Sequence, residues 1–148
     1  MKRLTIIIGA MLLAAGVHAQ GMKDPSSWRV SLVAQKGGYD VVFHTDLNPG
    51  WHIWSTHPGG DGTLIAPTFS IDQGPVTPVG PVREKGSVTE EVMEGIDGKV
   101  RYMKGQADFI QTVKAKSGET VKGSYTYQLC SESMCLPPKT ATFSLLIP

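Results

Sequence analysis

Cysteine is scarce in this chain, and the features of a nucleic-acid-binding or integral membrane protein are missing. Only two of the 148 residues are cysteines, and the formal net charge is +1. Without a basic excess, nucleic acid and acidic membrane surfaces are not expected as partners. No segment matches the run of about 20 apolar residues that a membrane span needs, so no stable membrane insertion is expected.

The longest apolar run lies at the start of the chain, in residues 4–17, directly after Lys2 and Arg3. A basic start, an apolar core and small residues before a cleavage point are typical of a secretory signal peptide. No cysteine follows the run, which excludes a lipid-modified cysteine there. We therefore predict a signal peptide over residues 1–19 and an exported domain over 20–148, in the periplasm of a Gram-negative bacterium. An uncleaved anchor is the alternative.

Removal of residues 1–19 would leave 12 Lys and Arg against 13 Asp and Glu, a net charge of −1. A chain of this length fits one domain and can bury a core without extra covalent links. We find no internal repeat, low-complexity tract or linker that would divide it.

The 3.6-residue period of an amphipathic helix is also missing, because apolar residues recur at every second position. This pattern predicts an all-β chain, and short strands separated by turn residues favour a β-sandwich. Proline at every third position from 75 to 81 places that segment at a sheet edge. The expected strands are 28–34, 39–43, 51–53, 68–71, 76–82, 100–104, 109–115, 121–129 and 141–147, with an irregular loop at 57–67.

The two cysteines, Cys130 and Cys135, lie between the last two predicted strands, where a hairpin end would place them opposite each other. A disulfide between them would close a very short loop. In the chain-entropy model such a loop contributes about 2 kcal/mol, against about 4.7 kcal/mol for a loop of 100 residues. As a structural link the bond is therefore poorly placed, and the geometry also allows both thiols to persist.

Three segments carry a resemblance to a known family. They are Tyr-Gln-Leu-Cys at 127–130, Met-Cys-Leu-Pro-Pro-Lys-Thr at 134–140, and Pro-Gly-Trp-His-Ile-Trp-Ser at 49–55. Together they resemble the N-terminal periplasmic domain of the thiol:disulfide interchange protein DsbD, and the order of segments agrees from about residue 28 to 148. The cysteine segment with its Pro-Pro is the most specific of the three.

The resemblance implies an immunoglobulin-like β-sandwich that performs thiol–disulfide exchange without a cofactor or metal. Its cysteine pair would take electrons from a membrane-linked or thioredoxin-like reductant and pass them to oxidised exported proteins. Cys135 would form the mixed disulfide with a partner, and Cys130 would resolve it. A cap loop would cover the pair, and further residues would flank it. The cap residues are Glu90, Glu91, Val92, Met93 and Glu94, and the flanking residues are Tyr127, Met134 and Pro137.

The chain departs from the family pattern in three respects. The best-known members have one more residue between the cysteines, and an aromatic residue at the cap tip where this chain has Met93. A thioether can still pack on sulfur, but it is more flexible. The membrane portion and the thioredoxin-like domain of full-length DsbD do not follow. We therefore expect thioredoxin-like proteins and a membrane electron-transfer protein to act in trans.

A second class of function stays open, namely a β-sandwich that binds a ligand or copper and keeps a fixed structural disulfide. The His44, His52 and His57 side chains show no tight metal-ligand spacing, and the Cys-His-Met order of a blue-copper site is missing. Trp51, Trp54 and the tyrosines can equally be core residues. Acidic neighbours and few nearby cations predict thiols that are not strongly acidified. The sequence does not indicate an oligomeric state.

Overall fold

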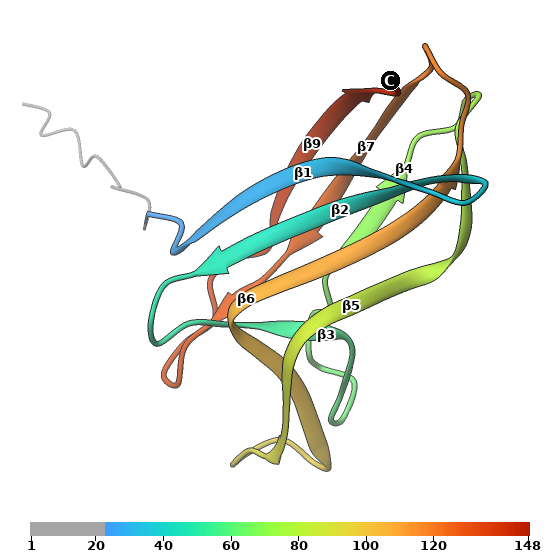
Figure 1. The fold of residues 1–148 in the computed structure, drawn as a ribbon. Coiled ribbons are helices and arrows are strands. Elements are labelled where there is room, and N and C mark those ends of the chain that lie inside the picture. Colours follow the sequence, from blue (N-terminus) through green and yellow to red (C-terminus); the bar gives the residue numbers. More distant parts are fainter. Residues whose placement is uncertain (1–22) are drawn as a thin grey trace, which may run out of the picture.

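The chain folds as two antiparallel β-sheets packed face to face (Figure 1), in a computed structural model that describes residues 23–148. The predicted signal peptide at residues 1–19 lies outside the described range. Within that range no helix is long and apolar enough to cross a membrane. The prediction of an all-β sandwich is confirmed.

The larger sheet has the order β1 (Ser26–Gln35), β2 (Gly38–Leu47), β6 (Lys99–Lys114), β3 (His52–Gly59) and β8 (Leu129–Cys130). β5 (Thr77–Val92) pairs with β6 along its other edge. The smaller sheet has the order β4 (Thr68–Ile71), β7 (Thr120–Tyr127) and β9 (Lys139–Leu146). Gly37, with a φ of 86°, closes the predicted hairpin between β1 and β2.

The strand β6 organises the larger sheet, because β2 and β3 share one of its edges in succession. The sequence predicted two strands here, 100–104 and 109–115, and the structure shows one continuous strand. Gly105 lies between the part that pairs with β3 and the part that pairs with β2, with a φ of 72°. Glycine accepts this backbone conformation readily, so the strand changes partner without ending.

The strand β5 is longer than its predicted range of 76–82 and extends to Val92. Among the strands of residues 23–148 it pairs with β6 alone, which agrees with the predicted edge position. In Figure 1 the far end of the β5–β6 hairpin, drawn in yellow, extends away from the two packed sheets. This end lies beside the cysteines, because residues of both line one cavity.

Aromatic residues from both sheets form the main core. Phe43 on β2 contacts Phe69 and Phe143 of the smaller sheet, with ring centroids 4.7 and 5.1 Å apart. Trp28 on β1 packs on Tyr127 of β7 at 4.7 Å. Burial of such large side chains is the main stabilising contribution in a domain of this size.

Candidate functional site

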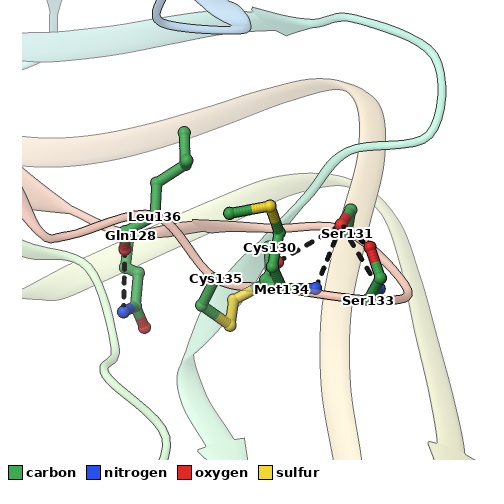
Figure 2. The surroundings of a disulfide bond; sticks show 7 residues. All are labelled: Gln128, Cys130, Ser131, Ser133, Met134, Cys135 and Leu136. Atoms are coloured by element: carbon green, nitrogen blue, oxygen red, sulfur yellow. Dashed lines mark hydrogen bonds between the residues drawn. A yellow bond between two sulfur atoms is a disulfide. The ribbon is translucent and has the colours of Figure 1, made fainter. Parts of the chain in front are cut away.

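Cys130 and Cys135 form a disulfide across the turn 131–134 (Figure 2). Their Cα atoms lie 4.0 Å apart, and the two residues pair as an isolated β-bridge. The Ser131 N–H donates to the Met134 carbonyl at 2.8 Å. The Ser131 hydroxyl accepts the backbone N–H groups of Ser133 and Met134, at 3.3 and 3.2 Å. These hydrogen bonds do not depend on the bond between the sulfur atoms.

The chain changes sheets just before the first cysteine. β7 ends at Tyr127, and Leu129 and Cys130 then pair with Ile53 and His52 of β3 in the larger sheet. The prediction of one strand over 121–129 is therefore wrong at its end. The alternation of apolar residues continues past Gln128 in the sequence, but the strand ends before this residue. Its side chain donates from Nε2 to the carbonyl of Leu136 at 3.0 Å.

The two cysteines differ in their exposure to solvent. Cys130 is 1% exposed, and Cys135 is exposed on the surface of the turn. An incoming protein can therefore contact Cys135 but not Cys130 without moving other groups.

Cys130 belongs to a second, smaller apolar cluster on the outer face of the larger sheet. Its other buried members are Trp54, Val100 and Tyr102, and Leu64, Met93 and Ile96 pack against them. A cavity of about 620 Å³ lies over this cluster. Its lining comes from β3, from the segment between β3 and β4, from the end of the β5–β6 hairpin and from the cysteine turn: His52, Trp54, Leu64, Glu91, Val92, Met93, Glu94, Ile96 and residues 130–135.

The predicted cap segment reaches this cavity, but it is not a loop throughout. Glu90, Glu91 and Val92 are the last residues of β5, and only Met93 and Glu94 belong to the turn that leads into β6. The predicted loop is corrected here, because the antiparallel pairing of β5 with β6 continues to the Val92–Lys99 pair.

The cap residues have different surroundings. Met93 is half-buried against the cluster that contains Cys130, whereas Val92 is 72% exposed. Glu91 accepts a hydrogen bond from the Tyr102 hydroxyl at 2.8 Å. Glu90 does not line the cavity and instead pairs with Lys99 at 3.0 Å.

The three residues predicted to flank the disulfide also lie in different surroundings. Met134 lines the cavity and is 44% exposed. Tyr127 lies in the main core, where its hydroxyl donates to Asp24 at 2.6 Å. Pro137 is exposed after the turn and does not line the cavity.

His52 and Trp54 are wall residues to which the sequence assigned no role in the site. Both are buried, at 5% and 3% exposure, and their rings lie 4.7 Å apart. β3 is buried at four successive positions, 52–55, since one face meets the main core and the other meets the small cluster. In a strand buried on both faces, apolar and polar residues do not alternate. The segment Trp-His-Ile-Trp-Ser lacks this alternation, so the sequence could have indicated burial on both faces here.

Burial and nearby charge shift the pKa values of two groups in this wall. The pKa of His52 is lowered to about 4, mainly because burial desolvates the ring; the ammonium of Lys104 also lowers it, and Glu91 opposes both effects. Burial raises the pKa of the Tyr102 hydroxyl, and its hydrogen bond to Glu91 adds to this increase. Lys139, the cation nearest to the cysteines in sequence, instead pairs with Asp24 at 2.7 Å.

Among residues 23–148, no group of three or more His, Cys, Asp or Glu side chains is placed to hold a metal ion. His44 lies between Asp46 and Asp108, at 3.2 and 2.6 Å, away from the cysteines in sequence and on another strand. The cavity by the disulfide instead carries the two cysteine sulfur atoms, an aromatic wall and the thioethers of Met93 and Met134, and these groups fit sulfur chemistry.

The fold and the site define a class of protein, namely an immunoglobulin-like β-sandwich with a cysteine pair for thiol–disulfide exchange. Residues 19–147 match the family model of the N-terminal domain of the thiol:disulfide interchange protein DsbD, so the chain belongs to this family. The resemblance noted in the sequence is confirmed. A search among curated protein sequences found no significant match.

Two solved structures are similar to the chain. The N-terminal periplasmic domain of ScsB from Proteus mirabilis matches with a TM-score of 0.62 and 19% sequence identity. That match covers 84% of this chain and 47% of the ScsB chain, so this chain spans about half the length of that domain. The reduced N-terminal domain of DsbD from Neisseria meningitidis matches with a TM-score of 0.44 and 22% identity, over 80% of this chain and 84% of that one.

Proposed function

We propose that the Cys130–Cys135 pair cycles between disulfide and dithiol, and that the protein relays electrons to oxidised exported proteins. The observation that carries this proposal is the unequal exposure of the pair. An exchange pair needs one sulfur that a partner can reach and a second sulfur protected from competing thiols. Cys135 is exposed and Cys130 is buried under the aromatic wall, which supports the first role for Cys135 and the second for Cys130.

In this proposal the Cys135 thiolate attacks a sulfur of the partner's disulfide. The bond between the partner's sulfurs breaks, and one of them leaves with the electron pair as a thiolate. Cys130 then attacks Cys135, the internal disulfide forms, and the partner's second sulfur leaves. The pair loses two electrons and the partner gains them. The reverse sequence, with a thioredoxin-like or membrane-linked reductant in trans, restores the dithiol.

The cap and the location of the protein are parts of the same proposal. Met93 covers the small cluster around Cys130, which supports a cap that limits access to the pair. The flanking role of Met134 has similar support from its place in the cavity lining. Disulfides form and persist in oxidising compartments such as the periplasm, and the predicted signal peptide at residues 1–19 supports export there.

Titration of the purified protein against a glutathione redox buffer tests the proposal. We expect the pair to be half-reduced at a potential above about −300 mV, because structural disulfides typically lie below this value. A pair that stays oxidised at the reducing end of the titration would instead support the binding module with a fixed disulfide.

A further inference from the structure

His52 and Cys130 occupy directly opposed positions on β3 and β8. Opposed residues of an antiparallel pair point to the same face of a sheet, with Cβ atoms about 4.5 to 5.5 Å apart. The imidazole therefore lies beside the side chain of Cys130, on the face that carries the cavity. Lys104 of β6 opposes His52 on the other side, so the three residues form one row across three strands.

The Nε2 atom of His52 is buried and has no hydrogen-bond partner among residues 23–148. Buried polar atoms usually have a partner, because an unpaired one costs about 1 to 3 kcal/mol. His44 illustrates the usual case, since both of its ring nitrogens contact carboxylates. The indole N–H of Trp54 in the same wall is also unpaired within the described part of the chain, but it can only donate, whereas an imidazole nitrogen can accept a hydrogen bond from a partner that forms in the cavity.

Reduction of the disulfide creates such a partner. A Cys130 thiol would be a proton donor at the position opposite His52, and it has to lose this proton before it can attack Cys135. A thiol in apolar surroundings ionises poorly, and the small cluster keeps water away from Cys130. Resolution therefore requires a base inside the site, and an exposed Cys135 does not.

We propose that His52 is a catalytic residue of the exchange, and that its imidazole accepts the proton of the Cys130 thiol during resolution of the mixed disulfide. This inference rests on the proposed function, because it concerns the second step of that reaction. The proton moves from Cys130 Sγ to His52 Nε2 while the Cys130–Cys135 bond forms. The bond from Cys135 to the partner breaks, and the leaving sulfur takes the electron pair. The imidazolium then returns its proton to this thiolate or to water.

The charged groups around His52 keep it in the form that accepts a proton. Desolvation and the charge of Lys104 together lower its pKa to about 4, so the imidazole is neutral near pH 7. Glu91 on β5 has the opposite effect on the pKa of His52. Tyr102 packs on the ring at 4.7 Å, and Glu132 lines the same cavity from the cysteine turn. A thiolate formed opposite His52 would supply the counter-charge for the imidazolium.

Reduced protein mixed with oxidised glutathione provides the test, because acid quenching and mass spectrometry separate the mixed disulfide from the internal one. At saturating oxidised glutathione the mixed disulfide forms quickly, so the rate at which the internal disulfide appears equals the rate of the resolution step. We expect His52→Gln to slow resolution about 10²-fold near pH 6, the usual contribution of a general base. The difference should shrink above about pH 9, where hydroxide can ionise the thiol. Formation of the mixed disulfide should change less than about twofold, because it uses the exposed Cys135.

Two further variants complete the design. His57→Gln alters an exposed histidine on the same strand and should leave both steps unchanged. Lys104→Met removes the cation that lowers the pKa of His52, so the pH below which resolution slows should move upward. This second variant changes an exposed position and tests the base even if His52→Gln does not fold.

The possible outcomes separate the two proposals. Equal resolution rates in His52→Gln and the unaltered protein, or a loss that is the same at every pH, would overturn the role of His52 while exchange stands. An unaltered protein that forms no mixed disulfide and no internal disulfide would overturn the proposed function itself. If resolution slows below the same pH in Lys104→Met as in the unaltered protein, this result would also contradict the role of His52.

Discussion

Individual residues differ sharply around the disulfide, and the difference is one of access. Cys135 is exposed on the turn, whereas Cys130 lies in a cluster with Trp54 and Tyr102. Thiol–disulfide exchange proceeds by attack along a path that a partner can reach. The two sulfurs therefore cannot serve equally, although the sequence places them only five positions apart.

We predict that Cys130→Ala accumulates a mixed disulfide with an oxidised thioredoxin-like protein through Cys135, because the resolving thiol is missing. Cys135→Ala should trap little, since its remaining thiol is buried. Non-reducing electrophoresis followed by mass spectrometry of the linked peptides measures both. Equal trapping by the two variants would contradict the assigned roles.

Asp24 gives a second prediction at this scale, on acid stability. Burial raises the pKa of Asp24, but hydrogen bonds from Lys139, Ser26 and Tyr127 outweigh it and bring the value to about 2, below the ordinary 3.8. A lowered folded-state pKa stabilises the fold above pH 3.8, and this contribution is lost as the pH falls towards 2.

The measurement is urea unfolding of the protein and of Asp24→Asn at several pH values. Asp24→Asn should be less stable near neutral pH, because the amide carries no charge for Lys139. The two proteins should converge as the pH falls to about 2, where the carboxylate of Asp24 becomes protonated in the folded state. A constant difference over the whole range would show that the ionised carboxylate does not stabilise the fold.

Among the elements, β3 and the β5–β6 hairpin create the site together. β3 supplies Ile53 to the main core and, on its other face, His52 and Trp54 to the cavity. The end of the hairpin covers this second face with Met93 and Ile96. A strand that would otherwise expose a tryptophan to water is thus buried on both sides.

We predict that Met93→Ala increases the rate at which small thiols such as dithiothreitol reduce the disulfide. Loss of the thioether opens the small apolar cluster above Cys130, so solvent and thiols gain access. Val88→Ala is the matched control, since this β5 residue does not line the cavity. It should leave the rate unchanged. Unaltered kinetics in Met93→Ala would remove the cap from the proposal and leave the exchange chemistry in place.

The sequence predicted the elements better than their ends. Period-two patterns located β1, β2, β4 and β9 because one face of each is buried and the other is not. The same rule divided β6 at Gly105, where the strand continues and changes partner, and it extended β7 past Tyr127, where the chain crosses to the other sheet. Both errors arise where tertiary pairing, which local periodicity does not contain, decides the path of the chain.

The sequence predicted the cysteines of the candidate site, but only some of the residues that surround them. The motif and the resemblance identified the cysteines and the segment from Glu90 to Glu94. They did not separate Met93, which packs by Cys130, from Glu90, which pairs with Lys99. His52 was missed because a lone histidine on a strand has many structural uses, and its proximity to Cys130 depends on a pairing between distant segments.

At the scale of the whole molecule, we expect the disulfide to contribute little to the stability of the fold, because the loop it closes is short. The sandwich is stabilised by aromatic packing between the sheets, for example of Phe43 on Phe69 and of Trp28 on Tyr127. The cysteine turn lies outside this core and keeps hydrogen bonds of its own through Ser131. We therefore expect the domain to lose and regain the bond without losing its structure, as a redox cycle requires.

We predict that the oxidised and reduced forms share one fold, and that reduction lowers the free energy of unfolding by at most about 2 kcal/mol, the value for a loop this short. Typical domains have about 5 to 15 kcal/mol of stability, so the reduced protein should stay folded at room temperature. Urea unfolding with and without dithiothreitol, followed by circular dichroism, measures the difference. A larger loss, or unfolding on reduction alone, would make the bond a structural link and remove the main physical support for exchange.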